Sequence, residues 1–158
     1  STIANELEKK LYKNGFLSYL LDGDNIRVGL NKDLGFSDND RKENIRRISE
    51  VSRLMIDAGI IVITAFISPF NEERELARTL VLSDNYFLVH VDCSVEKCEE
   101  RDVKGLYKKA RNGEIKNFTG IDSPYEIPKN PNLVVNTEKE TVNESVEKIF
   151  DAIKDKIN

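Results

Sequence analysis

Apolar residues recur with two different spacings along the chain, which predicts helices and strands in alternation. Residues 1–14 carry apolar side chains at every fourth position, so this segment is predicted to be an amphipathic helix that ends at Gly15. A short apolar run at 19–21 follows, which is typical of a strand. The chain therefore begins with a helix and continues into a sheet.

The rest of the chain repeats this alternation. Residues 41–58 have the period of a second helix, and residues 60–66 are almost continuously hydrophobic, as expected of a parallel strand covered on both faces. Further helices are predicted at 71–81, from Ser94 onward and from Val142 to the C-terminus, and further strands at 87–91 and 133–135. This order predicts a three-layer α/β fold, in which helices flank a mostly parallel central sheet.

Residues 104–131 lack apolar periodicity and are rich in glycine, proline and lysine. Such a composition is typical of a mobile segment that closes over a site, so we expect a basic lid here. The chain has 158 residues, which suits one compact unit. We expect a single domain over residues 1–158.

Charge and composition exclude some classes of binding partner. The chain has 24 basic and 28 acidic residues, and a net charge of −4 gives no footprint for nucleic acid or an anionic membrane. No apolar run approaches the roughly 18 residues of a membrane span, and no signal pattern opens the sequence. Cys93 and Cys98 are expected to be free thiols. We therefore expect a cytoplasmic protein that binds neither nucleic acid nor membrane.

Polar residues follow the predicted strands at the edge where parallel sheets bind ligands. Asp22, Asp24 and Arg27 come directly after the first strand. A carboxylate there can orient a hydroxyl or hold magnesium, and an arginine can pair with a phosphate or sulfate. A solvated Asp-Gly turn is the alternative interpretation. Ser68 follows the second strand, where it can meet an anion or simply cap the next helix.

Cations and one aromatic residue of the predicted lid add to this picture. Lys104 opens the lid, and cations on a closing segment neutralise charge during phosphoryl transfer. Phe118 is a candidate stacking surface for a purine ring, although a role in anchoring the loop to the core fits equally well. Arg41 belongs to a charged run, and on a helix such a run is usually a solvated face. The single histidine, His90, lies inside a predicted strand and is interpreted as structural.

Three stretches together resemble the adenylylsulfate kinases: LLDGDNIRVGLNKDLGFSDNDRKENIRRISEV, VITAFISP and CEERDVKGLYKKARNGEIKNFTGIDSPYE. The resemblance implies a P-loop kinase fold that uses ATP with Mg²⁺. It also implies transfer of the ATP γ-phosphate to the 3′-hydroxyl of adenosine 5′-phosphosulfate, which gives 3′-phosphoadenosine 5′-phosphosulfate in sulfate assimilation. A homodimer is implied as well, and association with or fusion to an ATP sulfurylase is left open.

The same resemblance implies roles for individual residues. The catalytic residues implied are Asp22, Asp24, Ser68 and Lys104. The acceptor-binding residues implied are Asp24, Asn25, Ile26, Arg27, Phe36, Arg41, Asn44, Ile67, Ser68, Lys104 and Phe118, with the two phenylalanines stacking on adenine. Ser1, Thr2 and Arg101 are expected to contact ATP, and Ser1 and Asp22 to hold magnesium. Ser68 is a candidate phosphate carrier, but we expect direct transfer, because a positioned hydroxyl, magnesium and cations suffice.

Two features depart from the family pattern. Val28 stands where many relatives have a histidine. Ser1 and Thr2 are all that this sequence contains of the glycine-rich phosphate loop, which ends in Gly-Lys-Ser-Thr. We expect the complete protein to carry that loop and the strand before it. A chain without them is expected to leave strand edges unpaired and to bind ATP very weakly.

Two other functions fit parts of the pattern. One is a P-loop kinase for another small molecule, such as a nucleoside or a shikimate-like alcohol, but a nonnucleotide substrate would not need the two stacking rings of Phe36 and Phe118. The other is a nonenzymatic nucleotide-binding regulatory domain. The missing loop argues for it, but the catalytic residue types are present at Asp22, Asp24, Ser68 and Lys104, which argues against it.

Overall fold

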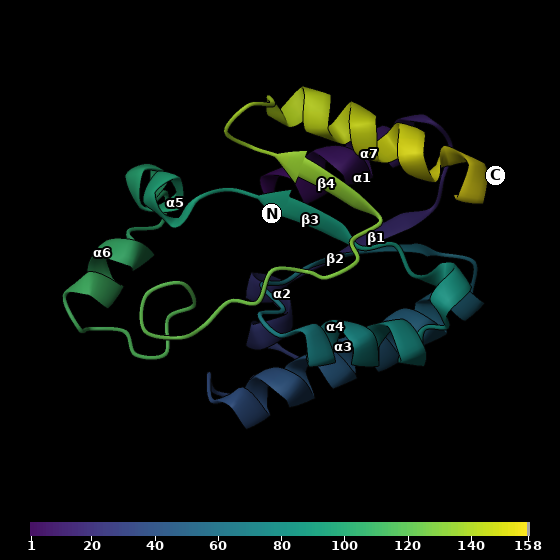
Figure 1. Ribbon diagram of the computed structural model, residues 1–158. Helices are drawn as coiled ribbons and strands as arrows, with labels where there is room; N and C mark the ends of the chain where they lie inside the picture. Colours follow the sequence, from purple (N-terminus) through teal and green to yellow (C-terminus); the bar gives the residue numbers. More distant parts are fainter. Residues whose placement is uncertain (158) are drawn as a thin grey trace.

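The computed structural model describes residues 1–157 and places helices on both sides of short parallel strands (Figure 1). The first helix, α1 (Thr2–Lys13), packs beside the last one, α7 (Val142–Ile157), on one side. Helices α3 (Asp38–Asp57) and α4 (Asn71–Leu80) lie together on the other side. This arrangement confirms the predicted three-layer α/β fold.

All four strands run parallel to their partners. β1 (Ser18–Asp22) pairs with β2 (Ile61–Ala65), and β3 (Val89–Asp92) pairs with β4 (Leu133–Asn136). Over residues 1–157 the two pairs form separate two-stranded sheets. The predicted parallel strands flanked by helices are thus confirmed, and the sheet is divided between the two pairs.

β2 is less buried than its hydrophobic sequence predicts. None of its residues is fully buried, and Thr64 is exposed. Both faces are nevertheless covered as expected, since Ile61 and Ile63 pack against the cluster that contains Leu7 and Leu11, and Val62 packs against the cluster that contains Ile48. Burial is incomplete because β2 pairs only with β1 among the described residues, so its other edge has no strand neighbour to exclude water.

Three short helices lie in segments that the apolar periodicity left irregular: α2 (Gly23–Val28), the 3-10 helix η1 (Ser83–Asn85) and α6 (Leu106–Arg111). Each is too short to display a repeated helical period, which explains why they were not predicted. By contrast, α5 (Val95–Arg101) follows the predicted N-cap, where the Ser94 hydroxyl accepts a hydrogen bond from the amide of Lys97. Side-chain capping thus located a helix that periodicity could not.

Two apolar clusters hold the layers together. The first joins α1 and α7 to the strands through Leu7, Leu11, Val135, Val146 and Ile149. The second consists of Leu21, Ile26 and Ile48, from β1, α2 and α3. Leu21 and Ile26 flank the polar residues that follow β1, so this second cluster fixes the point at which those residues emerge.

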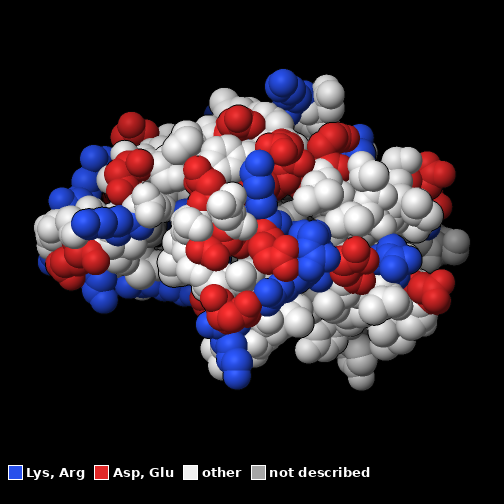
Figure 2. All heavy atoms as spheres, turned by 90° about the horizontal axis from the view of Figure 1, so that it is seen from below, with Lys and Arg blue, Asp and Glu red and all other residues white. Residues whose placement is uncertain are grey.

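The surface carries charges of both signs. Figure 2 shows basic and acidic side chains intermingled on one face of the molecule. Ion pairs such as those of Glu43 with Arg46 and Arg47 contribute to the mixture on α3. Within residues 1–157, no helix combines the length and apolar character needed to cross a membrane.

Candidate functional site

The junction between β1 and α2 forms the first part of the site. Asp22 is the N-cap of α2, and its carboxylate accepts a hydrogen bond from the amide of Asp24 at 2.9 Å. The side chain of Asn25 accepts in return from the amide of Asp22 at 3.2 Å. This reciprocal capping fixes both aspartates at the sheet edge. Asn25 therefore has a structural role that its predicted contact with the acceptor did not include.

Asp22 is an ionised carboxylate next to a hydroxyl. The Ser1 hydroxyl donates a hydrogen bond to it, and Thr2 begins α1 directly afterwards. Partial burial acts to raise the pKa of Asp22, but hydrogen bonds from Ser1 and Asp24 and the charge of Lys104 outweigh it and lower the pKa. Hydroxyl and carboxylate oxygens are ligands that Mg²⁺ prefers, so the Ser1–Asp22 pair fits the predicted magnesium site. No larger group of acidic, cysteine or histidine ligands surrounds it within residues 1–157, so a bound ion would keep water or phosphate oxygens as further ligands.

Lys104, at the start of the predicted lid, forms an ion pair with Asp24. This hydrogen bond raises the pKa of Lys104, so its ammonium group stays charged at neutral pH. The two side chains are 58% and 77% exposed. An exposed ion pair adds little to stability, so a ligand can separate the two groups at small cost. The pair brings a cation and a carboxylate from distant segments to the same sheet edge.

The partly buried Arg27 and the exposed Phe36 form a cation–aromatic contact. The guanidinium carbon of Arg27 lies 4.3 Å from the centroid of the Phe36 ring, and the guanidinium donates to the carbonyl of Gly35 at 2.9 Å. Burial and the nearby Arg41 guanidinium lower the pKa of Arg27. A guanidinium group whose charge is disfavoured by a neighbouring cation is a place where an anion is stabilised.

Arg41 connects two distant segments of the chain. Its side chain, on α3, is buried and donates to the carbonyl of Phe36 at 3.1 Å. The same guanidinium donates to the carbonyl of Asn117 at 2.6 Å and to the hydroxyl of Thr119 at 3.1 Å. Phe118 lies between these two lid residues. One buried arginine thus brings the segments of both predicted stacking rings together.

The lid turn around Phe118 is held by its own contacts. The carboxylate of Asp122 accepts hydrogen bonds from the amides of Asn117 at 2.8 Å and Phe118 at 2.5 Å. The Phe118 ring is half-buried and packs edge-on against Tyr107 of α6, with ring centroids 4.9 Å apart. This contact supports the anchoring role that the sequence left open, and stacking on adenine stays a prediction.

Ser68 occupies the turn after β2, and Ile67 beside it is 60% exposed. The φ angle of Ser68 is 42°, in the left-handed region that residues other than glycine rarely adopt. Arg74 of α4 donates a hydrogen bond to the carbonyl of Ser68 and another, at 2.6 Å, to the carbonyl of Glu126 near the end of the lid. The sequence analysis missed Arg74, because a single arginine on an amphipathic helix gives no local signal of burial.

The side chains of three predicted site residues have other partners. Ile26 is 9% exposed and lies in the core, so only its backbone can face a ligand. The side chain of Asn44 is buried and accepts a hydrogen bond from Asn31 at 2.8 Å. Arg101 donates to the carbonyl of Thr137, just past β4, at 2.6 Å. In this arrangement the side chains of Asn44 and Arg101 stabilise the fold by hydrogen bonds within the protein, and their predicted ligand contacts stay predictions.

A polar cavity of about 120 Å³ lies behind the Ser68 turn, between α3, α4 and β2. The hydroxyl of Ser52, the Nε atom of Arg74 and the carboxylate oxygens of Glu73 are buried here without a hydrogen-bond partner among residues 1–157. Groups of this kind are normally solvated by internal water, for which the cavity has room. The turn that presents Ser68 therefore rests on a polar, incompletely bonded layer.

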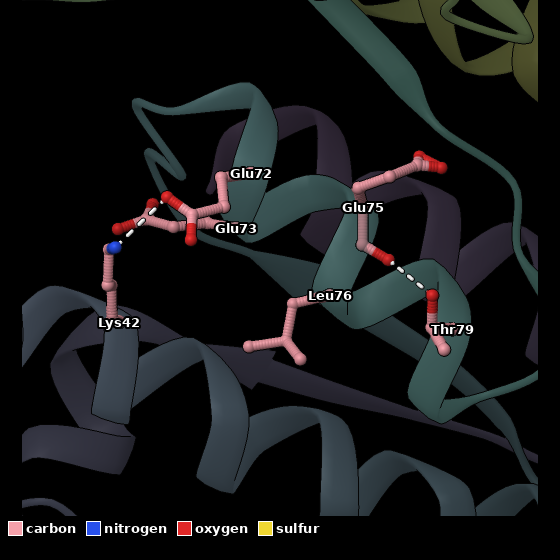
Figure 3. Close-up of a pocket in the computed structure, with 6 residues that line it drawn as sticks. All are labelled: Lys42, Glu72, Glu73, Glu75, Leu76 and Thr79. Carbon is pink, nitrogen blue, oxygen red and sulfur yellow. Dashed lines mark hydrogen bonds and ion pairs between the residues drawn. The ribbon is translucent and has the colours of Figure 1, made fainter.

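Glu73 provides a prediction about stability. Figure 3 shows it on α4 beside Glu72, which pairs with Lys42 of α3. Glu73 is only 1% exposed, and burial raises its pKa, although Arg41 is among the cations that oppose the shift. When the pKa of a carboxyl is higher in the folded state, the free energy of unfolding of the protein decreases with rising pH. The decrease runs from the pKa of the unfolded state, about 4.3, up through the pKa of the folded state. Glu73→Gln should therefore gain stability relative to wild type over this range.

Urea unfolding of Glu73→Gln between about pH 4 and about pH 8 checks this result, with an expected gain on the order of 1 kcal/mol at the upper end. Glu72→Gln is the matched control, because the Glu72 side chain is 78% exposed and its ion pair contributes little. A stability difference between Glu73→Gln and wild type that does not change with pH would contradict the prediction.

Comparison with known proteins points to the same family as the sequence motifs. The family model described as adenylylsulphate kinase matches residues 1–136. An adenylyl-sulfate kinase of Clostridium acetobutylicum is 61% identical over 154 residues, which cover 98% of this chain and 76% of that protein. Another, from Clostridium kluyveri, is 58% identical over 157 residues, covering 99% of this chain and 78% of that protein.

The fold agrees as well. The solved structure of an APS kinase of Mycobacterium tuberculosis, in complex with AMPPNP and APS, superposes with a TM-score of 0.91 at 46% identity. The match covers 97% of this chain and 89% of that chain. Since sequence and fold both match over nearly the whole chain, it belongs to the adenylylsulphate kinase family of ATP-dependent kinases.

Proposed function

We propose that the residues gathered around Arg41 and Asp24 carry out the reaction of this family. The chain is an enzyme that transfers the γ-phosphate of ATP to the 3′-hydroxyl of adenosine 5′-phosphosulfate, releasing ADP. The observation that supports the assignment best is the set of hydrogen bonds from Arg41 to Phe36, Asn117 and Thr119. They bring the segments that carry Phe36 and Phe118 next to a buried cation, which suits the binding of an anionic adenine nucleotide.

Acceptor binding is assigned to the cationic and aromatic side chains around Arg41. Arg27 and Arg41 face the phosphosulfate charge, since their guanidinium groups lie close enough to repel each other. Phe36 and Phe118 stack on the adenine. The backbone around Ile26 and Ile67, with Asn25 and Asn44 behind it, shapes the remaining wall.

The chemical step is assigned to the carboxylates and to Lys104. The 3′-oxygen forms a bond to the γ-phosphorus while the bond to the bridging oxygen breaks, and ADP leaves with the electron pair. Asp24, or Asp22 beside it, aligns the hydroxyl and accepts its proton late in a loose transition state. Lys104 neutralises charge on the transferred group. Ser68 binds the acceptor, and transfer is direct, without a phosphoserine.

ATP and magnesium are assigned to the other side of the same edge. Ser1, Thr2 and Arg101 contact ATP, and Ser1 and Asp22 hold Mg²⁺, which when bound neutralises phosphate charge. We further propose a single domain over residues 1–158, a lid at 104–131 that closes over both nucleotides, a cytoplasmic homodimer, and an ATP sulfurylase as an associated or fused partner.

Substrate selectivity tests the proposal. ADP release by the full-length protein is measured with adenosine 5′-phosphosulfate, AMP and adenosine as acceptors. We expect turnover with the sulfated nucleotide to exceed that with AMP at least about 100-fold, because unpaired cations in the site disfavour a smaller anion. Equal turnover with adenosine would indicate a different small-molecule kinase. Absence of ADP release with every acceptor would indicate a nonenzymatic nucleotide-binding domain.

A further inference from the structure

Arg74 occupies a buried position between the Ser68 turn and the end of the lid. It lies in the first half of α4 and is 6% exposed. Besides its hydrogen bond to the carbonyl of Ser68, the guanidinium donates to the side chain of Asn71 at 2.9 Å and to the carbonyl of Glu126 at 2.6 Å. Three acceptors from three segments thus share one side chain.

Separate hydrogen bonds fix the lid end to the same turn. The amide of Glu126 donates to the carbonyl of Pro69 at 2.8 Å, and the carboxylate of Glu126 accepts from the amide of Asn71 at 2.7 Å. Tyr125, one residue earlier, lies under the Arg74 guanidinium at 5.8 Å and stacks against His90 of β3. The end of the lid therefore cannot move away without breaking contacts at the Ser68 turn.

The Ser68 turn needs such support. Its left-handed backbone is unfavourable for a serine and persists only where the surroundings fix it. The polar cavity behind the turn supplies little constraint, because the side chains of Ser52 and Glu73 there have no hydrogen-bond partner in the described part of the chain. Of the contacts around the turn, the fork of Arg74 is the one that holds both the Ser68 carbonyl and the lid.

We propose that Arg74 is a positioning residue, which sets the place of the Ser68 hydroxyl and couples it to the anchored end of the lid. The inference rests on the proposed role of Ser68 in acceptor binding. It implies that the presentation of Ser68 and the seating of the lid over the acceptor change together.

Arg74→Lys tests the proposal in the full-length protein. Lysine keeps the charge but cannot span three acceptors with a planar fork. We expect kcat/KM for adenosine 5′-phosphosulfate to fall about 30-fold, while the KM for ATP stays within about two-fold. Arg78→Lys is the matched control on the same helix, because Arg78 packs over Tyr86 and pairs with Glu75, away from the turn. It should retain wild-type kinetics.

A double-mutant cycle with Ser68→Ala separates positioning from a general structural role. In the Ser68→Ala background, Arg74→Lys should lower kcat/KM by less than about three-fold, since the hydroxyl that it positions is gone. A full 30-fold loss in that background, or an equal rise in the KM for ATP, would overturn the proposal. Wild-type kinetics of Ser68→Ala alone would instead refute the role of Ser68, and the proposal with it.

Asn71→Ala keeps the test decisive if Arg74→Lys does not fold. The Asn71 side chain accepts hydrogen bonds from Arg74 and from the amide of Lys129. Its loss therefore weakens the same connection between Arg74 and the end of the lid without removing a buried charge. We expect a three- to five-fold loss, on the order of one neutral hydrogen bond, that disappears in the Ser68→Ala background. A loss that persists there would count against the proposal.

Discussion

Asp24→Asn is expected to lower kcat about 100- to 1,000-fold while the KM for adenosine 5′-phosphosulfate stays within about three-fold. Asparagine has nearly the same shape, but it neither accepts the proton of the 3′-hydroxyl nor attracts Lys104. Because the Asp24 side chain is 77% exposed, the fold should tolerate the change. Steady-state ADP release over a range of acceptor concentrations provides both constants.

Asp22→Asn extends the test to the second carboxylate. Its side chain can still accept a hydrogen bond from the amide of Asp24, so the cap of α2 should persist. Loss of its negative charge is expected to raise the magnesium concentration needed for half-maximal turnover about ten-fold. Asp57→Asn, at the exposed C-terminal end of α3, is the control. Unchanged turnover in both the Asp22 and the Asp24 variant would refute the assignment of the carboxylates.

Arg41→Gln is expected to raise the KM for adenosine 5′-phosphosulfate about 100-fold. The change removes a cation that faces the acceptor and breaks the hydrogen bonds that join Phe36 to Asn117 and Thr119. Hydrogen bonds to charged groups are worth about 1.5–3 kcal/mol each, so losing part of this set accounts for a change of that size. Kinetics with varied acceptor measure the effect, and amide exchange of residues 117–119 should accelerate.

Arg47→Gln is the matched control for this variant. Arg47 lies on the same helix, but its hydrogen bonds go to Asp33, Glu43 and the carbonyl of Leu30. It should bind the acceptor as wild type does. An Arg41→Gln variant with normal acceptor KM and unchanged exchange at 117–119 would remove the main support for the proposed site.

The long amphipathic helices were predictable because apolar side chains recur along the face that each helix buries. The periods of α1, α3 and α7 are long enough to identify a buried face. The polar residues after β1 and β2 were also recognisable, since each lies immediately beyond an apolar run. α2 and α6 were missed, because six residues contain less than two helical turns.

The partners of individual side chains were not predictable. The side chain of Ile26 lies in the core, and that of Asn25 caps α2, two partners that the motif around them does not reveal. The incomplete burial of β2 depends on which edges find a neighbour, a property of the whole sheet.

The sequence alone determined the layered α/β fold, the family and the chemical types of residue at the sheet edge, because these depend on local periodicity and short motifs. Only the tertiary structure decided that Arg41 contacts Asn117 and Thr119, which lie 76 and 78 positions further along the chain. The same holds for Arg74, which links Ser68 to Glu126. Such contacts depend on how helices and loops pack, and no local pattern of charge or hydrophobicity encodes the partner of a buried arginine.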